Sequence, residues 1–308
     1  MTIKVDKVLN KGNQQEERAE LVDNNIQLTE EVFEDLSKKK IKKILNDISP
    51  GFCLAKWYQV TLHLQNGHTH SCHHPATHRV EPREMVDNPS ALHNTAYKKM
   101  QRYRMLNGER PEECSYCWRV ENASEDNISD RYYKSSEKWA FPYIEEAKKL
   151  PWNHDFLPRY LEVSFGHACN FKCMYCMPHI SSSIMAEFEK EGHFVESPEN
   201  SLHELYVSGK YPIPKDAPNP YVEAFWRWWP ELKDHLEFFR ITGGEPLINP
   251  NTFRFLEYIV KNPMPHLSFS INSNLGIPIS QYQKFLNYMK QILENGSIKY
   301  FEFYTSVD

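Results

Sequence analysis

Seven cysteines are the residues of this 308-residue sequence best suited to carry chemistry. Three of them form the segment Cys169-Asn-Phe-Lys-Cys173-Met-Tyr-Cys176. Iron–sulfur clusters are held by cysteine thiolates, commonly one for each iron of a [4Fe–4S] cube. Three closely spaced ligands leave one iron open, and an open iron can chelate a substrate and pass one electron to it. A zinc site that borrows His167 or His179 as its fourth ligand is the alternative.

The four earlier cysteines are Cys53, Cys72, Cys114 and Cys117. The first two flank a predicted β-hairpin, and the Cys-x-x-Cys pair follows a predicted helix. Four thiolates can complete a metal site with no open position, which suits a structural or electron-relay role. Three readings stay open: an iron–sulfur cluster, a zinc site with four thiolates, or a redox-active Cys114/Cys117 pair.

A second segment that could bind a ligand is Ile-Thr-Gly243-Gly244-Glu245-Pro, at the end of a predicted strand. The two glycines let the backbone approach a ligand closely. The carboxylate of Glu245 could accept hydrogen bonds from an ammonium group.

The elements that must position these segments alternate between strand and helix from Arg159 onward, which predicts a parallel α/β sheet. The expected strands span residues 160–165, 237–242, 267–272 and 299–307, and the expected helices span residues 180–191, 220–235, 251–261 and 279–294. Period-2 alternation places polar side chains on one face of these strands. We expect that face to be the ligand-holding interior of a curved sheet, with solvent exposure as the alternative.

The first half of the chain is expected to hold fewer regular elements. Residues 1–28 are polar and predict a frayed segment. A helix is expected over residues 29–47, followed by two short strands within 53–72 that meet at the Asn66-Gly67 turn. Further helices are expected over residues 90–106 and near 136–149.

The three-cysteine motif directly after a strand resembles the radical S-adenosylmethionine (SAM) superfamily, whose pattern also places an aromatic residue where Tyr175 stands. The resemblance implies an enzyme that uses a [4Fe–4S] cluster and an external electron donor to cleave SAM reductively, giving methionine and a 5′-deoxyadenosyl radical that abstracts hydrogen. It implies that Gly243, Gly244 and Glu245 hold the amino group of SAM. It also implies contacts from Asn272 and Ser306, and from Asn274 unless that residue only makes a turn. It identifies no catalytic residue.

The earlier cysteines, with the segment from Asn88 to Cys117, resemble the twitch domain, a shortened SPASM domain that holds auxiliary iron–sulfur clusters. This resemblance implies a second cluster, and it implies a peptide- or protein-modifying enzyme. The sequence departs from the pattern because the twitch domain usually follows the catalytic barrel, whereas here it precedes it.

The expected organisation has four parts. They are a polar segment and helix over residues 1–50, a small α+β twitch-like domain over 51–120, a connector over 121–158 and a radical SAM core over 159–308. Barrels of this superfamily usually have six strand–helix units, so four strands predict a partial (βα) barrel that is truncated after its fourth strand. We expect that strand to leave an unpaired edge, in an incomplete reading frame or in a chain completed by a second polypeptide.

Composition limits the class of protein further. A net charge of −5 gives no argument for a nucleic-acid or anionic-membrane partner, and the mean hydropathy of −0.66 is ordinary for a soluble protein. Clustered cysteines without a signal peptide favour the reducing cytoplasm. Two rival classes stay open: a non-catalytic zinc- or iron–sulfur-binding interaction protein, and an electron-transfer protein with two clusters.

Overall fold

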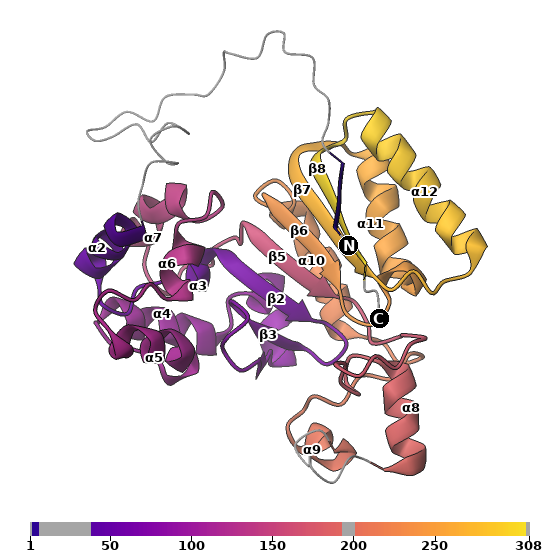
Figure 1. Cartoon of the computed structure of the whole chain (residues 1–308), viewed down its shortest axis with the longest axis horizontal. Helices are drawn as coiled ribbons and strands as arrows, with labels where there is room; N and C mark the ends of the chain where they lie inside the picture. The colour runs from indigo at the N-terminus through magenta and orange to yellow at the C-terminus, as the bar shows by residue number, and fades with distance from the viewer. Residues whose placement is uncertain (1, 6–37, 193–200, 306–308) are drawn as a thin grey trace.

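One eight-stranded sheet runs through the part of the chain that this computed structural model describes, residues 2–5, 38–192 and 201–305 (Figure 1). The strands lie in the order β1-β8-β7-β6-β5-β2-β3-β4, and β2, β5, β6, β7 and β8 are parallel. Their bounds are β1 Thr2–Val5, β2 Gln59–His63, β3 His68–His70, β4 His78–Arg79, β5 Tyr160–Ser164, β6 Phe238–Thr242, β7 Met264–Ser273 and β8 Ile298–Thr305. The architecture is therefore mixed α/β with a mostly parallel sheet.

The strands and helices expected after Arg159 are confirmed, except that residues 306 and 307 of the last strand lie outside the described residues. The helices are α8 Ser182–Glu191, α10 Pro220–Leu232, α11 Pro250–Lys261 and α12 Ile279–Glu294, with a further short helix, α9 Leu202–Val207. Four of these five helices begin at a residue whose side chain accepts a hydrogen bond from the first turn: Ser181, Ser201, Asn219 and Asn249. Such caps satisfy backbone N–H groups that have no partner within the helix.

Helices α10, α11 and α12 cover one face of the parallel strands (Figure 1). The apolar side chains of β5 to β8 point into this layer, as the period-2 alternation predicts. The ring of Phe239 lies 5.6 Å from that of Trp229 and 4.4 Å from that of Phe255, measured between centroids. This aromatic packing fixes the sheet against its helices, and so fixes the loops that leave the ends of the strands.

The first half of the chain differs from several predictions. The Asn66-Gly67 hairpin is confirmed, but residues 55–58 form helix α3 instead of a strand. The helix expected over 90–106 is split into a 3₁₀ turn, Pro89–Leu92, and α4 Ala96–Leu106, because Thr95 caps a new helix. The helix expected near 136–149 is confirmed only in its second half. Helix α6, Asp130–Ser135, ends before it, and α7, Ile144–Lys149, follows a 3₁₀ turn, Phe141–Tyr143, whose Pro142 suits the start of a helix.

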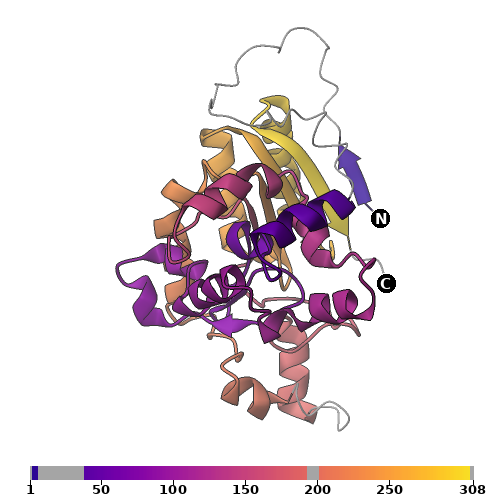
Figure 2. The same cartoon turned by 90° about the vertical axis from the view of Figure 1, so that its left-hand side faces the viewer.

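A second apolar core belongs to this first half. It is built from α2 Lys38–Ile48, α3, α5 Ser115–Ala123 and the segment 128–156, which contributes aromatic side chains such as Tyr132, Trp139 and Phe156. The predicted connector thus contributes side chains to this core. Figure 2 shows these helices nearest the viewer, with the strands and the later helices behind them.

Two strand pairings were not expected. Strand β2 pairs in parallel with β5 over five residues, from Gln59 opposite Tyr160 to His63 opposite Ser164, so the hairpin extends the later sheet. Strand β1 pairs antiparallel with the outer edge of β8. The prediction that this edge is unpaired is wrong, and residues 2–5 form a strand. The rest of the predicted polar segment and most of the helix expected over 29–47 lie outside the described residues.

Candidate functional site

The three closely spaced cysteines lie on the loop between β5 and α8, at the carboxyl end of the parallel strands. The first turn of α8 holds the start of this loop, where the Cys169 N–H donates to Ser182 Oγ at 3.0 Å and Ser183 Oγ donates to the Cys169 carbonyl at 2.7 Å. All three thiols are half-buried. Burial, and then the charges of Cys169 and Cys173, raise the pKa of the Cys176 thiol, so the three sulfur atoms lie within interacting range.

The loop between β5 and α8 that carries the three cysteines is called the cluster loop below. The two glycines directly after β6 let the loop that follows β6 touch it. Gly243 and Gly244 have φ angles of 77° and 44°, in the left-handed region that favours glycine. A Cβ on Gly243 would lie 1.8 Å from Ser164 Oγ, and one on Gly244 would lie 2.4 Å from the Ala168 carbonyl oxygen. Any side chain here would therefore separate the two loops.

The Glu245 side chain is buried, and both of its carboxylate oxygens accept hydrogen bonds. Glu245 is 1% exposed. Its Oε1 accepts from the Ser273 hydroxyl at 2.7 Å and from the Leu247 N–H at 2.9 Å, and its Oε2 accepts from the Asn274 N–H at 2.7 Å. Burial raises the pKa of this carboxyl, although the three hydrogen bonds oppose the shift.

Asn274, at the end of β7, completes the junction of the three loops. Its side-chain amide donates to Cys169 Sγ at 3.7 Å and to Asn170 Oδ1 at 3.3 Å. Its own side-chain oxygen accepts from the Gly276 N–H at 2.8 Å. The structure thus brings together four predicted residues, Cys169, Gly244, Glu245 and Asn274, from the ends of three adjacent strands.

The other residues predicted to bind the cofactor lie at varied distances from this junction. Tyr175 is 66% exposed on the cluster loop. Asn272 lies on β7, two residues before Asn274, and its side-chain oxygen accepts a hydrogen bond from Arg240 Nε at 2.9 Å. Ser306 lies outside the described residues. His179, a candidate zinc ligand, has its pKa lowered to about 4 by burial and then by the charges of Lys210 and His68.

The polar face of the strands is present as predicted and is half-buried. Glu162 accepts a hydrogen bond from the Thr242 hydroxyl at 3.2 Å and lies 3.8 Å from Arg240 Nε. The Arg240 guanidinium stands 4.6 Å from the centre of the Tyr304 ring. Its side chain keeps 26% of its surface exposed, so a charged and polar surface is open beside the loop junction.

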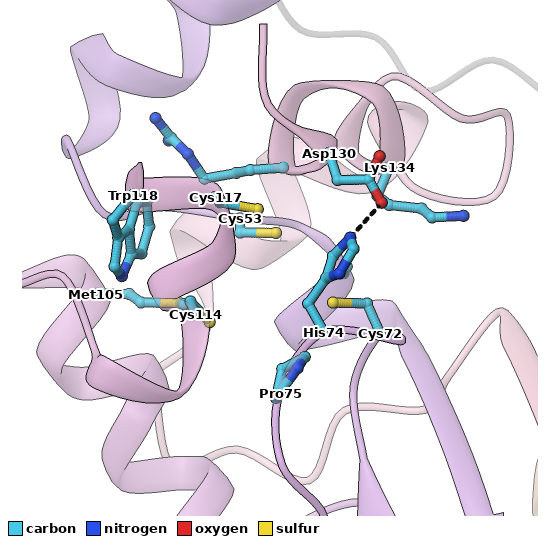
Figure 3. A pocket seen from close by; sticks show the side chains of 12 residues that line it. Cys53, Cys72, His74, Pro75, Met105, Cys114, Cys117, Trp118, Asp130 and Lys134 are labelled. Atoms are coloured by element: carbon cyan, nitrogen blue, oxygen red, sulfur yellow. Dashed lines mark hydrogen bonds and ion pairs between the residues drawn. The ribbon is translucent and has the colours of Figure 1, made fainter. Parts of the chain in front are cut away.

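The four earlier cysteines line one pocket (Figure 3). Cys53 comes just before α3, Cys72 follows β3, and Cys114 and Cys117 flank the start of α5. In Figure 3 the sulfur atoms of Cys53 and Cys117 point into the pocket from one wall, and Cys72 reaches in from the opposite wall. Burial, followed by the charges of the other three cysteines, raises the pKa of Cys53 to about 12. The structure therefore brings together all four predicted ligands.

Hydrogen-bond donors already point at the sulfur atoms of this pocket. The backbone N–H of His74 donates to Cys72, and the backbone N–H of Arg131 donates to Cys117, which in each case opposes the effect of burial on the thiol pKa. The Ser135 hydroxyl donates to Cys53 Sγ at 4.0 Å. Such donors stabilise thiolate, the form that binds metal.

A buried cation lies beside the same pocket. Lys56 pairs with Glu113, and both side chains are less than 8% exposed. Burial alone would lower the pKa of Lys56, but the negative charges of Cys114 and Glu113 raise it. The lysine therefore supplies positive charge to a site that gathers several thiolates.

At the pocket mouth, His74 Nε2–H donates to Asp130 Oδ2 at 2.8 Å (Figure 3). The His74 ring stacks on that of Tyr116 with 3.7 Å between centroids. A carboxylate on the far nitrogen of a histidine is the arrangement that orients histidines beside metals. The spacing of the cysteines gave no sign of this pair, because Asp130 lies 56 residues from His74.

Both cysteine groups have donor sets that fit iron–sulfur or zinc chemistry, because soft thiolates select these metals. As the side chains stand, no three His, Cys, Asp or Glu residues within 2–5, 38–192 and 201–305 converge closely enough to hold a metal ion. Metal binding would thus require the thiols to turn towards a common centre.

No helix in the described residues has the length and apolar character needed to cross a membrane.

Comparison with known proteins gives a partial match. A GTP 3′,8-cyclase of Nautilia profundicola is 28% identical over 125 residues, which cover 41% of this chain and 30% of the cyclase. A GTP 3′,8-cyclase of Campylobacter jejuni is 28% identical over 100 residues, 32% of this chain and 22% of the cyclase. The matched region thus spans less than a third of these relatives. No protein-family description and no solved structure matches the chain. The similarity, though weak and partial, supports the radical SAM superfamily.

Proposed function

We propose that this chain is a radical SAM enzyme, in which Cys169, Cys173 and Cys176 hold a [4Fe–4S] cluster with one open iron. The observation that carries the proposal is the junction of three loops at the carboxyl ends of β5, β6 and β7, where open parallel sheets bind their ligands. When bound and reduced by an external donor, the cluster supplies the electron that splits SAM into methionine and a 5′-deoxyadenosyl radical. The chain positions the three loops around the cluster, orients the nucleotide and excludes water from the site.

The polar face is the proposed place for the substrate. It lies next to the loop junction, and it offers a carboxylate at Glu162, a guanidinium at Arg240 and a phenol at Tyr304. His73, from the loop after β3, is within electrostatic range of Glu162 and Arg240, so the first half of the chain borders this face. We propose a partial barrel whose open side receives a large substrate, and the twitch-like resemblance favours a peptide or protein.

The four earlier cysteines are proposed to hold a second cluster. The donors aimed at their sulfur atoms and the buried Lys56 support a centre of several thiolates, for which zinc is the rival occupant. Among the described residues that line the pocket, Asp130 supplies the one carboxylate, so hard cations are a poor fit. The proposed site of action is the cytoplasm, where thiolates stay reduced.

Anaerobic reconstitution with iron and sulfide tests the proposal. Dithionite and SAM should then yield 5′-deoxyadenosine, and a Cys173→Ala variant should yield none. The matched control is Cys114→Ala/Cys117→Ala, which should keep the signal of a SAM-binding cluster. Protein that carries zinc at both sites and forms no 5′-deoxyadenosine would instead identify a non-catalytic relative.

A further inference from the structure

We infer that Glu245 is a positioning residue, which locks the end of β7 onto the cluster loop so that Asn274 meets Cys169. This inference rests on the proposed function, and it goes beyond the role that the resemblance implies for Glu245, the capture of the SAM amino group.

The first argument is that both oxygens of the Glu245 carboxylate already accept hydrogen bonds from within the protein. Three donors, Ser273 Oγ and the N–H groups of Leu247 and Asn274, lie within 2.9 Å of its two oxygens. A carboxylate offers about four lone-pair sites, so little acceptor capacity is left. With Glu245 1% exposed, an ammonium group could reach it only if these bonds were broken.

The second argument is that three hydrogen bonds of Glu245 join its loop to the neighbouring loops. Its backbone N–H donates to the Ala168 carbonyl at 2.7 Å, which ties the loop after β6 to the residue before Cys169. Its side chain ties the same loop to Ser273 and Asn274, at the end of β7. Gly244, which a Cβ would push against Ala168, keeps this junction tight.

The third argument is what Asn274 does once it is held. Because its backbone N–H is fixed on Glu245 Oε2, its side chain can reach Cys169 Sγ and Asn170 Oδ1. An amide donor on a ligating sulfur stabilises thiolate and tunes the centre that the thiolate binds. Glu245 therefore acts on the cluster through Asn274.

Glu245→Gln separates this role from ammonium binding. A glutamine has one acceptor oxygen for three donors, so at least one buried N–H or O–H loses its partner, at about a tenfold cost in the stability of the junction. We expect the variant, reconstituted without SAM, to lose iron from the SAM-binding cluster about tenfold faster than wild type. Its electron paramagnetic resonance signal should already differ before SAM is added.

Asn274→Ala should reproduce the same signal change, and the double variant should add nothing further, because both act on Cys169. Ser273→Ala removes one of the bonds that tie Glu245 to the end of β7, so it should lose iron faster than wild type but more slowly than Glu245→Gln. Glu257→Gln, an exposed carboxylate on α11 paired with Lys261, is the control for loss of charge. Thermal melting of each variant checks that the chain is folded.

The outcomes are distinct. If Glu245→Gln keeps its cluster and its SAM-free signal like wild type and loses only affinity for SAM, Glu245 is an ammonium ligand and the inference is overturned. If the Asn274→Ala and Glu245→Gln effects are additive, Glu245 does not act through Asn274. If wild type itself gives no SAM-sensitive cluster signal, the proposed function fails, independently of either result.

Discussion

The side-chain amide of Asn274 donates to the sulfur of Cys169 at 3.7 Å, although the two residues are 105 positions apart. The contact forms because β5, β6 and β7 are adjacent and parallel, so that the loops leaving their carboxyl ends meet on one edge of the sheet. The candidate site is thus a property of strand order. Changes that separate the loops should damage it even where no ligand residue is altered.

Gly244→Ala is the first such change. Its Cβ would lie 2.4 Å from a backbone oxygen, whereas Gly192, also at positive φ, has nothing within 4 Å of its Cβ position. We expect Gly192→Ala to cost about 2 kcal/mol through its backbone conformation alone, because its φ of 86° and ψ of 175° are nearly restricted to glycine. Gly244→Ala should cost about 3 kcal/mol, because overpacking against backbone adds to that strain. Urea unfolding of both variants checks the difference; equal losses would mean that the loops can part freely.

The second prediction concerns the metal at the four earlier cysteines. Cys114→Ala/Cys117→Ala removes half of the thiolates from the pocket, and we expect the chain to lose one whole metal centre. If the centre is a [4Fe–4S] cube, iron content should fall by about four atoms per chain. Metal analysis of the wild type and variant measures this. Retention of iron together with loss of about one zinc would assign the pocket to zinc.

Much of the later half of the chain could be predicted from the sequence, for physical reasons. Strands that bury one face show period-2 alternation, and α12 begins and ends at the predicted residues, 279 and 294, because Pro278 and Gly296 bound a long amphipathic run. The cluster loop and the Gly243-Gly244 turn could be found because their spacing is local.

The remaining features depend on pairings between distant residues, which local patterns do not encode. The apolar run before Gln59 is compatible with strand or helix, and α3 forms because of packing in the second core. The pairing of β2 with β5 joins segments about a hundred residues apart. The inward orientation of Glu245 depends on Ser273, which no local pattern of residues singles out.

The third prediction concerns Lys56, which lies between Glu113 and the thiols. Lys56→Met leaves the buried Glu113 carboxylate without its cation and should cost about 3 kcal/mol of stability. Replacing both, in Lys56→Met/Glu113→Leu, should restore most of that stability, since it removes the unpaired charge.

The same two variants report on the metal centre. Loss of the Lys56 cation should lower the reduction potential of a cluster in the pocket, because positive charge favours the more negative reduced state. The double variant should keep the lowered potential only if the lysine acts on the thiolates more strongly than Glu113 does. A potential that is unchanged in Lys56→Met would show that this ion pair serves folding alone.

The last prediction follows from the histidines of the β2–β3 hairpin. Burial, and then the nearby His70, lower the pKa of His63 from 6.5 to about 3. Between those two values the unfolded chain binds more protons at this position than the folded chain does. Stability is therefore fully present above pH 6.5 and falls as the pH drops towards 3, by up to about 1.4 kcal/mol per pH unit for this residue.

Urea unfolding at pH 7.5 and pH 5.0 measures this dependence. His63→Gln cannot take up the proton, so its stability should change less between the two pH values than that of wild type. His203→Gln is the matched control, because His203 is exposed on α9. If His63→Gln and wild type lose the same stability on acidification, His63 is not held neutral in the folded chain, and other groups of the hairpin must account for the loss.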